Sequence, residues 1–209
     1  MNEVRMYNDR EWLWPSADYH CWKHLTEQHP SVPDDILEIV GKVHTVVQAG
    51  GNCGLYTAAY AKHVNHVITF EPEPNNFNCL KENIKEKNVT MYEVALGDRS
   101  SNVGLKIDPI NSGATRIINE GTIPQVKLDD YNLQPDLIHL DIEGHEEYAL
   151  LGMLNTLEDA FLLTLYNGEI HELGQKDYTN YLGKLITKKQ LMKQSLNLNL
   201  LYFGKIKKQ

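Results

Sequence analysis

The segment DIEGHEE at residues 141–147 concentrates side chains that can move a proton. Asp141, Glu143 and His145 follow the apolar run DLIHL, which predicts a buried strand ending at this cluster. Neighbouring like charges raise the pKa of a carboxyl group, and histidine titrates near neutral pH. Each of the three is therefore a candidate general base for an acceptor group that must lose a proton, and Asp141 is the first choice.

A glycine-rich turn lies between a second apolar run and a predicted helix. The valine-rich run at 43–47 suits a covered central strand, and the helix is predicted over 55–62. Gly50, Gly51 and Gly54 relax the backbone between them, and the start of the helix favours a carboxylate or phosphate. The spacing matches neither the G-x-G-x-x-G fingerprint nor a P-loop, so the turn alone does not identify its ligand.

An acidic residue at the end of the next predicted strand narrows the choice of ligand. Glu71 ends the run VITFE, about 20 residues after Gly50, where a carboxylate can accept hydrogen bonds from both hydroxyls of a ribose. Pro72 and Pro74 end this strand and begin a helix predicted over 75–87. In an open α/β sheet these segments meet at the carboxyl ends of the strands, where ligands bind.

Together these segments resemble the FkbM family of S-adenosylmethionine-dependent methyltransferases. The resemblance covers roughly residues 43–155 and is carried by VVQAGGNCGLYT (46–57), FEPEPNNFNCLKENI (70–84), VALGD (94–98), LDDY (128–131) and DLIHLDIEGHE (136–146). It implies the class I methyltransferase fold, a Rossmann-like three-layer α/β sandwich whose mostly parallel sheet is closed by a C-terminal antiparallel hairpin. It also implies S-adenosyl-L-methionine as methyl donor, with a hydroxyl oxygen of a small molecule or sugar as acceptor.

The resemblance further implies a role for each matching position. The methionine part of the cofactor would meet Gly50, Gly51, Asn52 and Gly54, the ribose would meet Glu71 next to Pro72, the adenine would meet Ala95 and Leu96, and the reacting methyl group would meet Asp141. Gln48 departs from the family, which usually carries an acidic residue there. Gln48 can accept a hydrogen bond from the cofactor's ammonium group, but not a charge-assisted one.

Three alternatives stay open at this point. Asp141, Glu143 and Glu169 offer the hard oxygen ligands that Mg²⁺ prefers, although their spacing does not require a metal. Glu71 would also suit the ribose of a nicotinamide cofactor, and a Rossmann-like protein could bind a ligand without catalysis. His171 and Glu172, after a strand predicted at 161–166, are in position to join the site.

The order of the predicted elements indicates a single methyltransferase domain over residues 1–209. It divides into an N-terminal helical cap (1–42, helices at about 18–28 and 33–41), a cofactor-binding core (43–166) and a C-terminal helix and hairpin (167–209). The third strand is predicted at 89–95, and a further helix is predicted at 146–155. Residues 99–131 interrupt the alternation, and predict short antiparallel strands beside the pocket.

Composition and charge limit the classes of partner that the protein can bind. The chain is 42% hydrophobic and 23% charged, with a formal net charge of −8, and its last 32 residues hold seven lysines and no acid. The acidic remainder argues against a general nucleic-acid binder. No apolar run reaches the ~20 residues that span a bilayer, the N-terminus lacks a signal core, and three cysteines predict neither disulfides nor zinc. We predict a cytoplasmic protein with a small-molecule acceptor, no nucleic-acid or membrane partner, and an oligomeric state that the sequence does not indicate.

Overall fold

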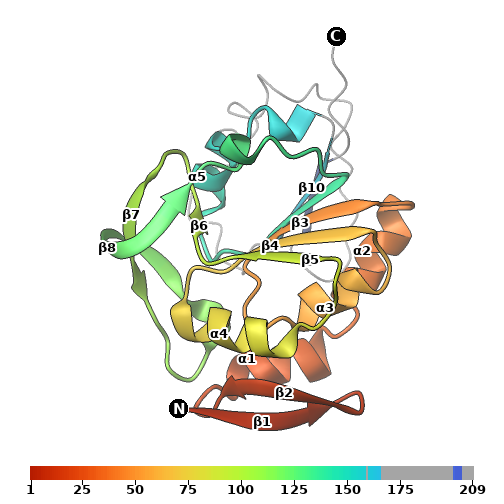
Figure 1. The fold of residues 1–209 in the computed structure, drawn as a ribbon, viewed down its shortest axis with the longest axis vertical. Helices are drawn as coiled ribbons and strands as arrows, with labels where there is room; N and C mark the ends of the chain where they lie inside the picture. Colours follow the sequence, from red (N-terminus) through yellow and green to blue (C-terminus); the bar gives the residue numbers. More distant parts are fainter. Residues whose placement is uncertain (159, 166–199, 204–209) are drawn as a thin grey trace.

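The computed structural model describes residues 1–158, 160–165 and 200–203 (Figure 1). Six of the described strands form one sheet in the order β11-β10-β9-β3-β4-β5. Their bounds are β3 Thr45–Ala49, β4 His66–Phe70, β5 Val89–Tyr92, β9 Leu137–Leu140, β10 Phe161–Leu165 and β11 Leu200–Phe203. Adjacent strands pair in parallel, except that β11 runs antiparallel to β10. The chain winds outward from β3 to β5 and then returns to β9, so β3 and β9 flank the switch point where such sheets bind ligands.

Helices cover both faces of this sheet, because successive strand residues point to opposite sides. Val46 and Val67 pack against α2 (Val32–Val40) and α3 (Leu55–Ala61). Val47 and Ile68 face the other way, in a cluster that includes residues of α5 (Glu146–Leu151). All three layers of the predicted α/β sandwich are therefore present, and the class I fold is confirmed.

Helix α4 (Pro74–Asn83) follows β4 as predicted, but it is shorter than the predicted range 75–87. The side chain of Glu73 caps its start by accepting a hydrogen bond from the amide of Asn76 at 2.6 Å, and Pro74 occupies the first turn. The helix ends at Asn83 because Ile84 adopts an extended backbone (ψ 116°). This cap fixes the chain between β4 and α4, and therefore holds Glu71 beside the glycine-rich turn.

The N-terminal segment corrects the description of residues 1–42 as helical. It opens with a hairpin of β1 (Asn2–Tyr7) and β2 (Arg10–Pro15), joined by Asn8 and Asp9 with φ of 49° and 56°. Positive φ at both central residues is the type I′ turn that matches the twist of paired strands. The predicted helices then follow: α1 (His20–Lys23), which continues as the π-helical turn His24–Gln28, and α2.

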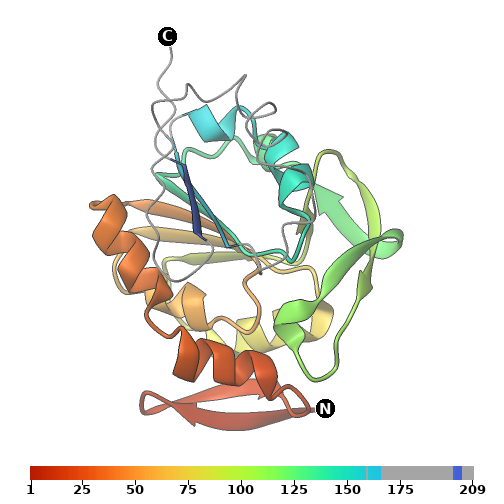
Figure 2. The same ribbon diagram turned by 180° about the vertical axis from the view of Figure 1, so that it is seen from behind.

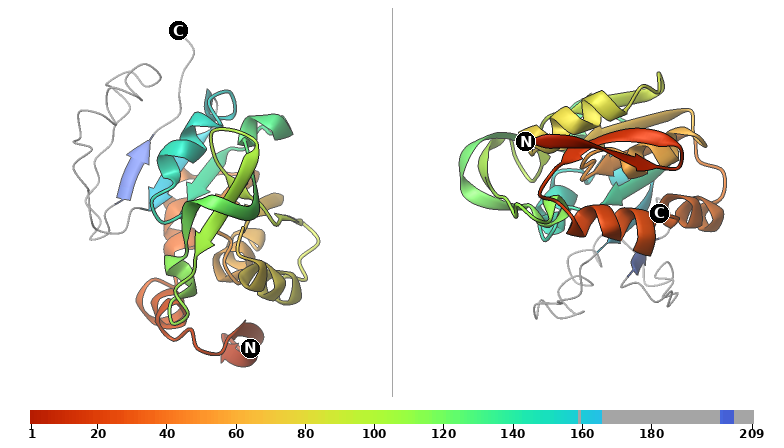
Figure 3. Two further views of the ribbon diagram at one scale, coloured as in Figure 1. Left: turned by 90° about the vertical axis from the view of Figure 1, so that its left-hand side faces the viewer. Right: turned by 90° about the horizontal axis from the view of Figure 1, so that it is seen from below.

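The hairpin is held on the body of the protein by the alternate residues of β2. Trp12 and Trp14 are buried in a cluster with Phe77 and Leu80 of α4. Figures 1 and 3 show the hairpin at one end of the molecule, and the view from behind in Figure 2 shows α1 beside it. Trp14 and Trp22 meet edge to face, with ring centroids 5.0 Å apart, which joins β2 to α1.

The third predicted strand, 89–95, is wrong as a single element. Its first part is β5, while β6 (Ala95–Leu96) leaves the main sheet and pairs in parallel with β8 (Arg116–Val126). In the described chain, β6, β8 and the antiparallel β7 (Ser101–Lys106) form a second sheet. The antiparallel strands predicted within residues 99–131, a segment called the excursion below, are confirmed. Short 3₁₀ turns complete the described elements: Ser112–Ala114, Leu128–Tyr131 and Thr156–Glu158.

The C-terminal predictions fall mostly outside the described residues. These are the helix at about 178–185, the loop residues Glu169, His171 and Glu172, and most of the closing hairpin. The described part contributes β11, whose Phe203 pairs with Leu162 of β10 in an antiparallel register. The full hairpin, like the division of the chain into three parts, stays a prediction.

Candidate functional site

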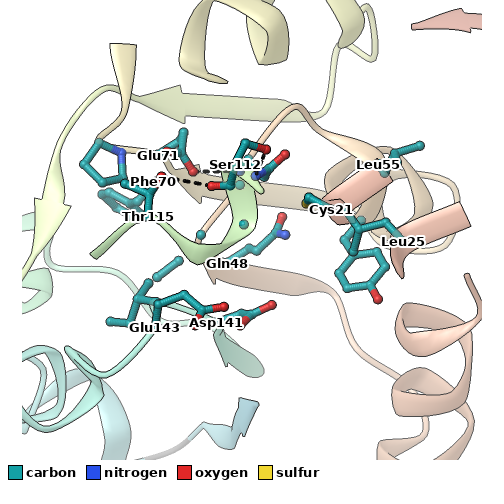
Figure 4. A pocket seen from close by; sticks show the side chains of 18 of the residues that line it. Cys21, Leu25, Gln48, Leu55, Phe70, Glu71, Ser112, Thr115, Asp141 and Glu143 are labelled. Carbon is teal, nitrogen blue, oxygen red and sulfur yellow. Dashed lines mark hydrogen bonds between the residues drawn. The ribbon is translucent and has the colours of Figure 1, made fainter. Parts of the chain in front are cut away.

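A cavity of about 590 Å³ lies at the carboxyl ends of β3, β4 and β9. This volume is in the range of ordinary small-molecule and cofactor sites. In Figure 4, Glu71 and Ser112 lie on one side of the cavity, Asp141 and Glu143 lie on the other, and Gln48 lies between them. The predicted site residues that line the cavity are Gln48, Gly50, Gly51, Asn52, Glu71, Pro72, Ala95, Leu96, Asp141 and Glu143.

Gly50 joins the glycine turn to the end of β9. Its φ is +89°, and a Cβ placed on it would lie 2.0 Å from the backbone oxygen of Asp141. No side chain fits there, so glycine is what lets the two strand ends approach. The turn and the acidic cluster therefore share one backbone contact.

The amides of the turn itself, at residues 50–54, all donate within the protein. Gly50 and Gly51 both donate to the carbonyl of Phe70 at 3.0 Å. Asn52 donates to Glu71 Oε2 at 2.7 Å. The two remaining amides also donate within the turn, Cys53 to the side chain of Asn52 and Gly54 to the carbonyl of Gly51.

Gly54 lies outside the cavity lining, unlike the other predicted turn residues. It precedes the first residue of α3 with φ +98°, and a Cβ on it would come within 3.1 Å of Leu80 and Ile84. Its small size serves the packing of α3 on α4. The structure thus separates Gly54 from Gly50, Gly51 and Asn52.

Glu71 is buried, with 5% of its surface exposed, and is held at both carboxylate oxygens. Oε2 accepts from the amide of Asn52, and Oε1 accepts from the amide of Glu73 at 2.9 Å. Burial raises the pKa of Glu71 to about 7, and the two backbone hydrogen bonds partly offset that rise. Glu71 therefore changes charge near neutral pH while its position stays fixed.

Asp141 and Glu143 form the acidic wall of the cavity. The amide of Asp141 continues the sheet by donating to Ala49 at 3.0 Å. Removal from water raises the pKa of Asp141 to about 8, and the charges of Glu143 and Glu146 add to the effect. The ionised form of such a group is a stronger base than an ordinary aspartate and can accept a proton from an acceptor group.

The structure does not bring His145 to the cavity. Its Nε2 lies 2.8 Å from Oε1 of Gln125, and its ring stacks on Tyr148 with centroids 4.8 Å apart. Burial lowers the pKa of His145, and Asp98 partly offsets this. The positive φ of Glu143 (54°) and Gly144 (100°) turns the chain between Asp141 and His145. These two residues therefore face different surroundings despite their closeness in sequence.

Gln48 is buried, and its carbonyl is engaged by hydroxyl groups. Oε1 accepts from Thr57 Oγ1 at 2.7 Å and from Thr69 Oγ1 at 3.4 Å. The acidic side chains that line the cavity are Glu71, Asp141 and Glu143 instead. A ligand that carries positive charge suits this wall.

Two segments contribute wall residues that the sequence did not identify. The N-terminal segment supplies His20, Cys21, His24, Leu25, Gln28, His29 and Val32, and the excursion and its flanks supply Leu105, Asn111, Ser112, Gly113, Thr115 and Ile117. The rings of His24 and His29 are 4.4 Å apart, and burial together with His29 lowers the pKa of His24. The placement of the excursion beside the pocket was predictable, and the dense aromatic and histidine residues at 12–24 were a signal for the first segment.

The predicted Mg²⁺ site of Asp141, Glu143 and Glu169 is not tested by the structure, because Glu169 lies outside the described residues. Within residues 1–158, 160–165 and 200–203, no group of three or more histidine, cysteine, aspartate or glutamate side chains is arranged to hold a metal. None of the helices in those residues has the length and apolar character needed to cross a bilayer.

Solved structures share this fold. A methyltransferase FkbM from Methylobacillus flagellatus KT is 18% identical, with a TM-score of 0.53 over 77% of this chain and 43% of that protein. An rRNA methylase from Streptococcus thermophilus is 14% identical, with a TM-score of 0.50 over 84% of this chain and 94% of that protein. This chain therefore spans less than half of the first protein's length. The absence of a nucleic-acid partner stays a prediction, because RNA-modifying proteins use the same fold.

Sequence comparison gives the family. The hexuronic acid methyltransferase AglP of Haloferax volcanii is 26% identical over 175 residues, which are 78% of this chain and 70% of that protein. The model of the methyltransferase FkbM domain matches residues 48–189, well over half of the chain. These matches give no support to the nicotinamide alternative or to a non-catalytic binding protein. The chain belongs to the FkbM family of methyltransferases.

Proposed function

We propose that this protein transfers a methyl group from S-adenosyl-L-methionine to a hydroxyl oxygen of a sugar or similar small molecule. The observation that carries the proposal is one cavity in which Asp141, with its raised pKa, lies across from Glu71 and the glycine turn. Family membership and the sugar-acid substrate in the name of the relative from Haloferax volcanii support it.

The residues of the cavity fit this cofactor. Glu71 would accept hydrogen bonds from the ribose hydroxyls, the turn at 50–52 would receive the methionine part, and Ala95 and Leu96 would contact the adenine. When bound, S-adenosyl-L-methionine supplies an electrophilic methyl group on a positively charged sulfonium. That positive charge favours the ionised forms of the three acidic side chains in the cavity, which reduces the need for an acidic side chain at position 48.

The chain's own contribution to the reaction is alignment and proton removal. The cavity walls would hold the acceptor hydroxyl in line with the methyl group, and such alignment supplies much of the rate. Asp141 would take the hydroxyl proton as the new carbon–oxygen bond forms. Burial, helped by the charges of Glu143 and Glu146, raises the pKa of Asp141 and makes its carboxylate a stronger base for that proton.

The direct test is an acceptor assay with labelled S-adenosyl-L-methionine. A hexuronic acid, the matching neutral hexose and an rRNA fragment are offered separately, and each product is exposed to mild alkali. Label that appears on a sugar and survives alkali is a methyl ether, which supports the proposal. Label released by alkali is a methyl ester and contradicts a hydroxyl acceptor, and label on the RNA alone contradicts a sugar acceptor.

Cofactor affinity should depend on pH through Glu71. Its pKa of about 7 means that roughly a tenth of the carboxyl groups are ionised at pH 6 and roughly nine tenths at pH 8. Because the ionised form makes the stronger hydrogen bonds, we expect Kd to be about tenfold higher at pH 6 than at pH 8. Ionisation of Asp141 beside a cationic ligand acts in the same direction. Calorimetry at pH 6, 7 and 8 measures this.

The matched variants for that measurement are Glu71→Gln and Glu93→Gln. Glu71→Gln should weaken binding about tenfold at pH 8 and flatten the pH dependence. Glu93 is an exposed carboxylate beyond the end of β5 and does not line the cavity, so Glu93→Gln should behave as wild type. An unchanged slope in Glu71→Gln would show that another group carries the pH dependence.

Replacement of His145 by alanine should leave methyl transfer nearly intact. His145 does not line the cavity, so we expect kcat to change less than about threefold, far from the 10²-fold or more of a general base. Loss of its contact with Gln125 should cost about 1 kcal/mol in the free energy of unfolding. Steady-state kinetics and urea unfolding measure the two effects. A 100-fold loss of kcat would contradict this prediction and show that His145 takes part in catalysis.

A further inference from the structure

Asp18 is a fully buried acidic residue to which the chemistry described above gives no role. It follows the hairpin, and three donors surround its carboxylate. Oδ2 accepts from Trp14 Nε1 at 2.9 Å and from the hydroxyl of Ser112, and Oδ1 accepts from the amide of Cys21 at 3.0 Å. Burial of a carboxylate is costly unless donors compensate for lost water, and here all three are supplied by the protein.

Ser112 extends this contact to the glycine turn. Its hydroxyl gives its one proton to Asp18 and accepts from Asn52 Nδ2 at 3.1 Å. The other end of the Asn52 side chain, Oδ1, accepts from the amide of Cys53 at 2.7 Å. The side chain of Asn52 is therefore fixed at both ends, on a residue whose φ is +47°. Asparagine tolerates this left-handed backbone better than most residues do.

The same residue positions Glu71. The backbone amide that Asn52 presents in this conformation donates to Glu71 Oε2 at 2.7 Å. A chain of hydrogen bonds, with Asn52 donating toward both ends, thus connects Asp18, Ser112, Asn52 and Glu71. Ser112, Asn52 and Glu71 all line the cavity, and Figure 4 shows Ser112 on the same side as Glu71.

We propose that Asp18 and Ser112 are positioning residues of the cofactor site. They act through Asn52 to hold the turn and the carboxylate of Glu71 in the arrangement that receives the ribose. The inference rests on the proposed use of S-adenosyl-L-methionine for its affinity readout. The N-terminal segment, through Asp18, and the excursion, through Ser112, would then both help to shape the cofactor site.

Substitution of Ser112 breaks this chain at its middle link. Ser112→Ala removes the bond to Asn52 while Trp14 and Cys21 still compensate the charge of Asp18. Asp18→Asn is less selective, because three donors then face an amide that itself carries donors. Ser16→Ala is the matched control, since its exposed hydroxyl lies in the same segment and bonds only to the backbone of Met1.

The experiment combines three measurements on the full chain at a temperature well below unfolding. Calorimetry gives Kd for S-adenosyl-L-methionine, hydrogen exchange of the ligand-free protein reports the amides at 50–54, and thermal unfolding gives Tm. We expect Ser112→Ala to raise Kd about tenfold and to speed exchange at Asn52 and Cys53. Ser112→Ala should add little to Asn52→Ala in the double variant, because both break the same chain. Ser16→Ala should match wild type.

A purely structural role gives a different pattern. Wild-type Kd and wild-type exchange at 50–54 in Ser112→Ala, even with a lower Tm, would overturn the proposal. Fully additive effects of Ser112→Ala and Asn52→Ala on Kd would overturn it as well. If the wild-type chain binds no S-adenosyl-L-methionine, the proposed function fails, and the exchange rates of the ligand-free variants still decide whether Ser112 orders the turn.

Discussion

Asp141→Asn should lower kcat about 10²- to 10⁴-fold while the protein stays folded. An amide has nearly the shape of the carboxyl group but cannot take the proton of an acceptor hydroxyl, and general-base catalysis is worth that range of rate. Cofactor affinity should change far less, because Glu71 and the turn remain intact. Single-turnover kinetics with saturating S-adenosyl-L-methionine measures the chemical step, and calorimetry measures the binding.

The pH dependence of kcat is a second test of the role of Asp141. The ionised form of Asp141 is the active base, so kcat should rise with pH until the pKa of Asp141 is passed. That pKa is about 8 in the free protein, and the positive charge of a bound sulfonium lowers it, so the rise should end at or below pH 8. Asp141→Asn should lose the rise. Retention of more than a tenth of wild-type kcat would show that a different group removes the proton.

Gly50→Ala should have the largest effect on stability. Its Cβ would lie 2.0 Å from the backbone oxygen of Asp141, which cannot move aside easily because the amide of Asp141 donates to Ala49 of β3. The positive φ adds about 1–2 kcal/mol for a residue with a side chain. We expect a loss of about 4 kcal/mol or more in the free energy of unfolding, or no folded protein at all. Urea unfolding followed by circular dichroism measures the change.

Gly144→Ala is the control that separates the two causes. Gly144 has a similar backbone, with φ +100°, but a Cβ on it would meet nothing within 4 Å. It should cost only the conformational part, about 1–2 kcal/mol. Equal losses in both variants would mean that the contact between the turn and Asp141 is not what requires glycine at position 50.

The covered strands were predictable because their pattern is local. Residues of β3, β4 and β9 form near-continuous apolar runs, and the segments after them carry the acidic and glycine residues of the cavity. Family resemblance then supplied the roles. The amino-acid sequence alone thus suffices to place Glu71, Asp141 and the turn together at the carboxyl ends of the parallel strands.

The remaining features depend on contacts between distant residues. The first strand of the hairpin has no buried residue, and the hairpin is held by Trp12 and Trp14 of the second strand, which pack on a helix about 60 residues later. β6 leaves the main sheet only because β8 offers it a partner. The contact between Asp18 and Ser112 spans 94 positions. The contact of His145 with Gln125 was not predictable, because closeness in sequence does not fix side-chain direction where the backbone takes a positive φ.

The separate sheet of β6, β7 and β8 offers a route for engineering this protein. It supplies Leu105 and Ile117 to the cavity, yet its ladder closes without any strand of the main sheet. We expect exchange of the segment from Leu105 to Ile117 between relatives to alter the acceptor range, whereas Leu96 of β6 and Val126 of β8 pack in the central core and must be kept. Such a graft must keep Ser112, since it is the point where the exchangeable part meets the donor site.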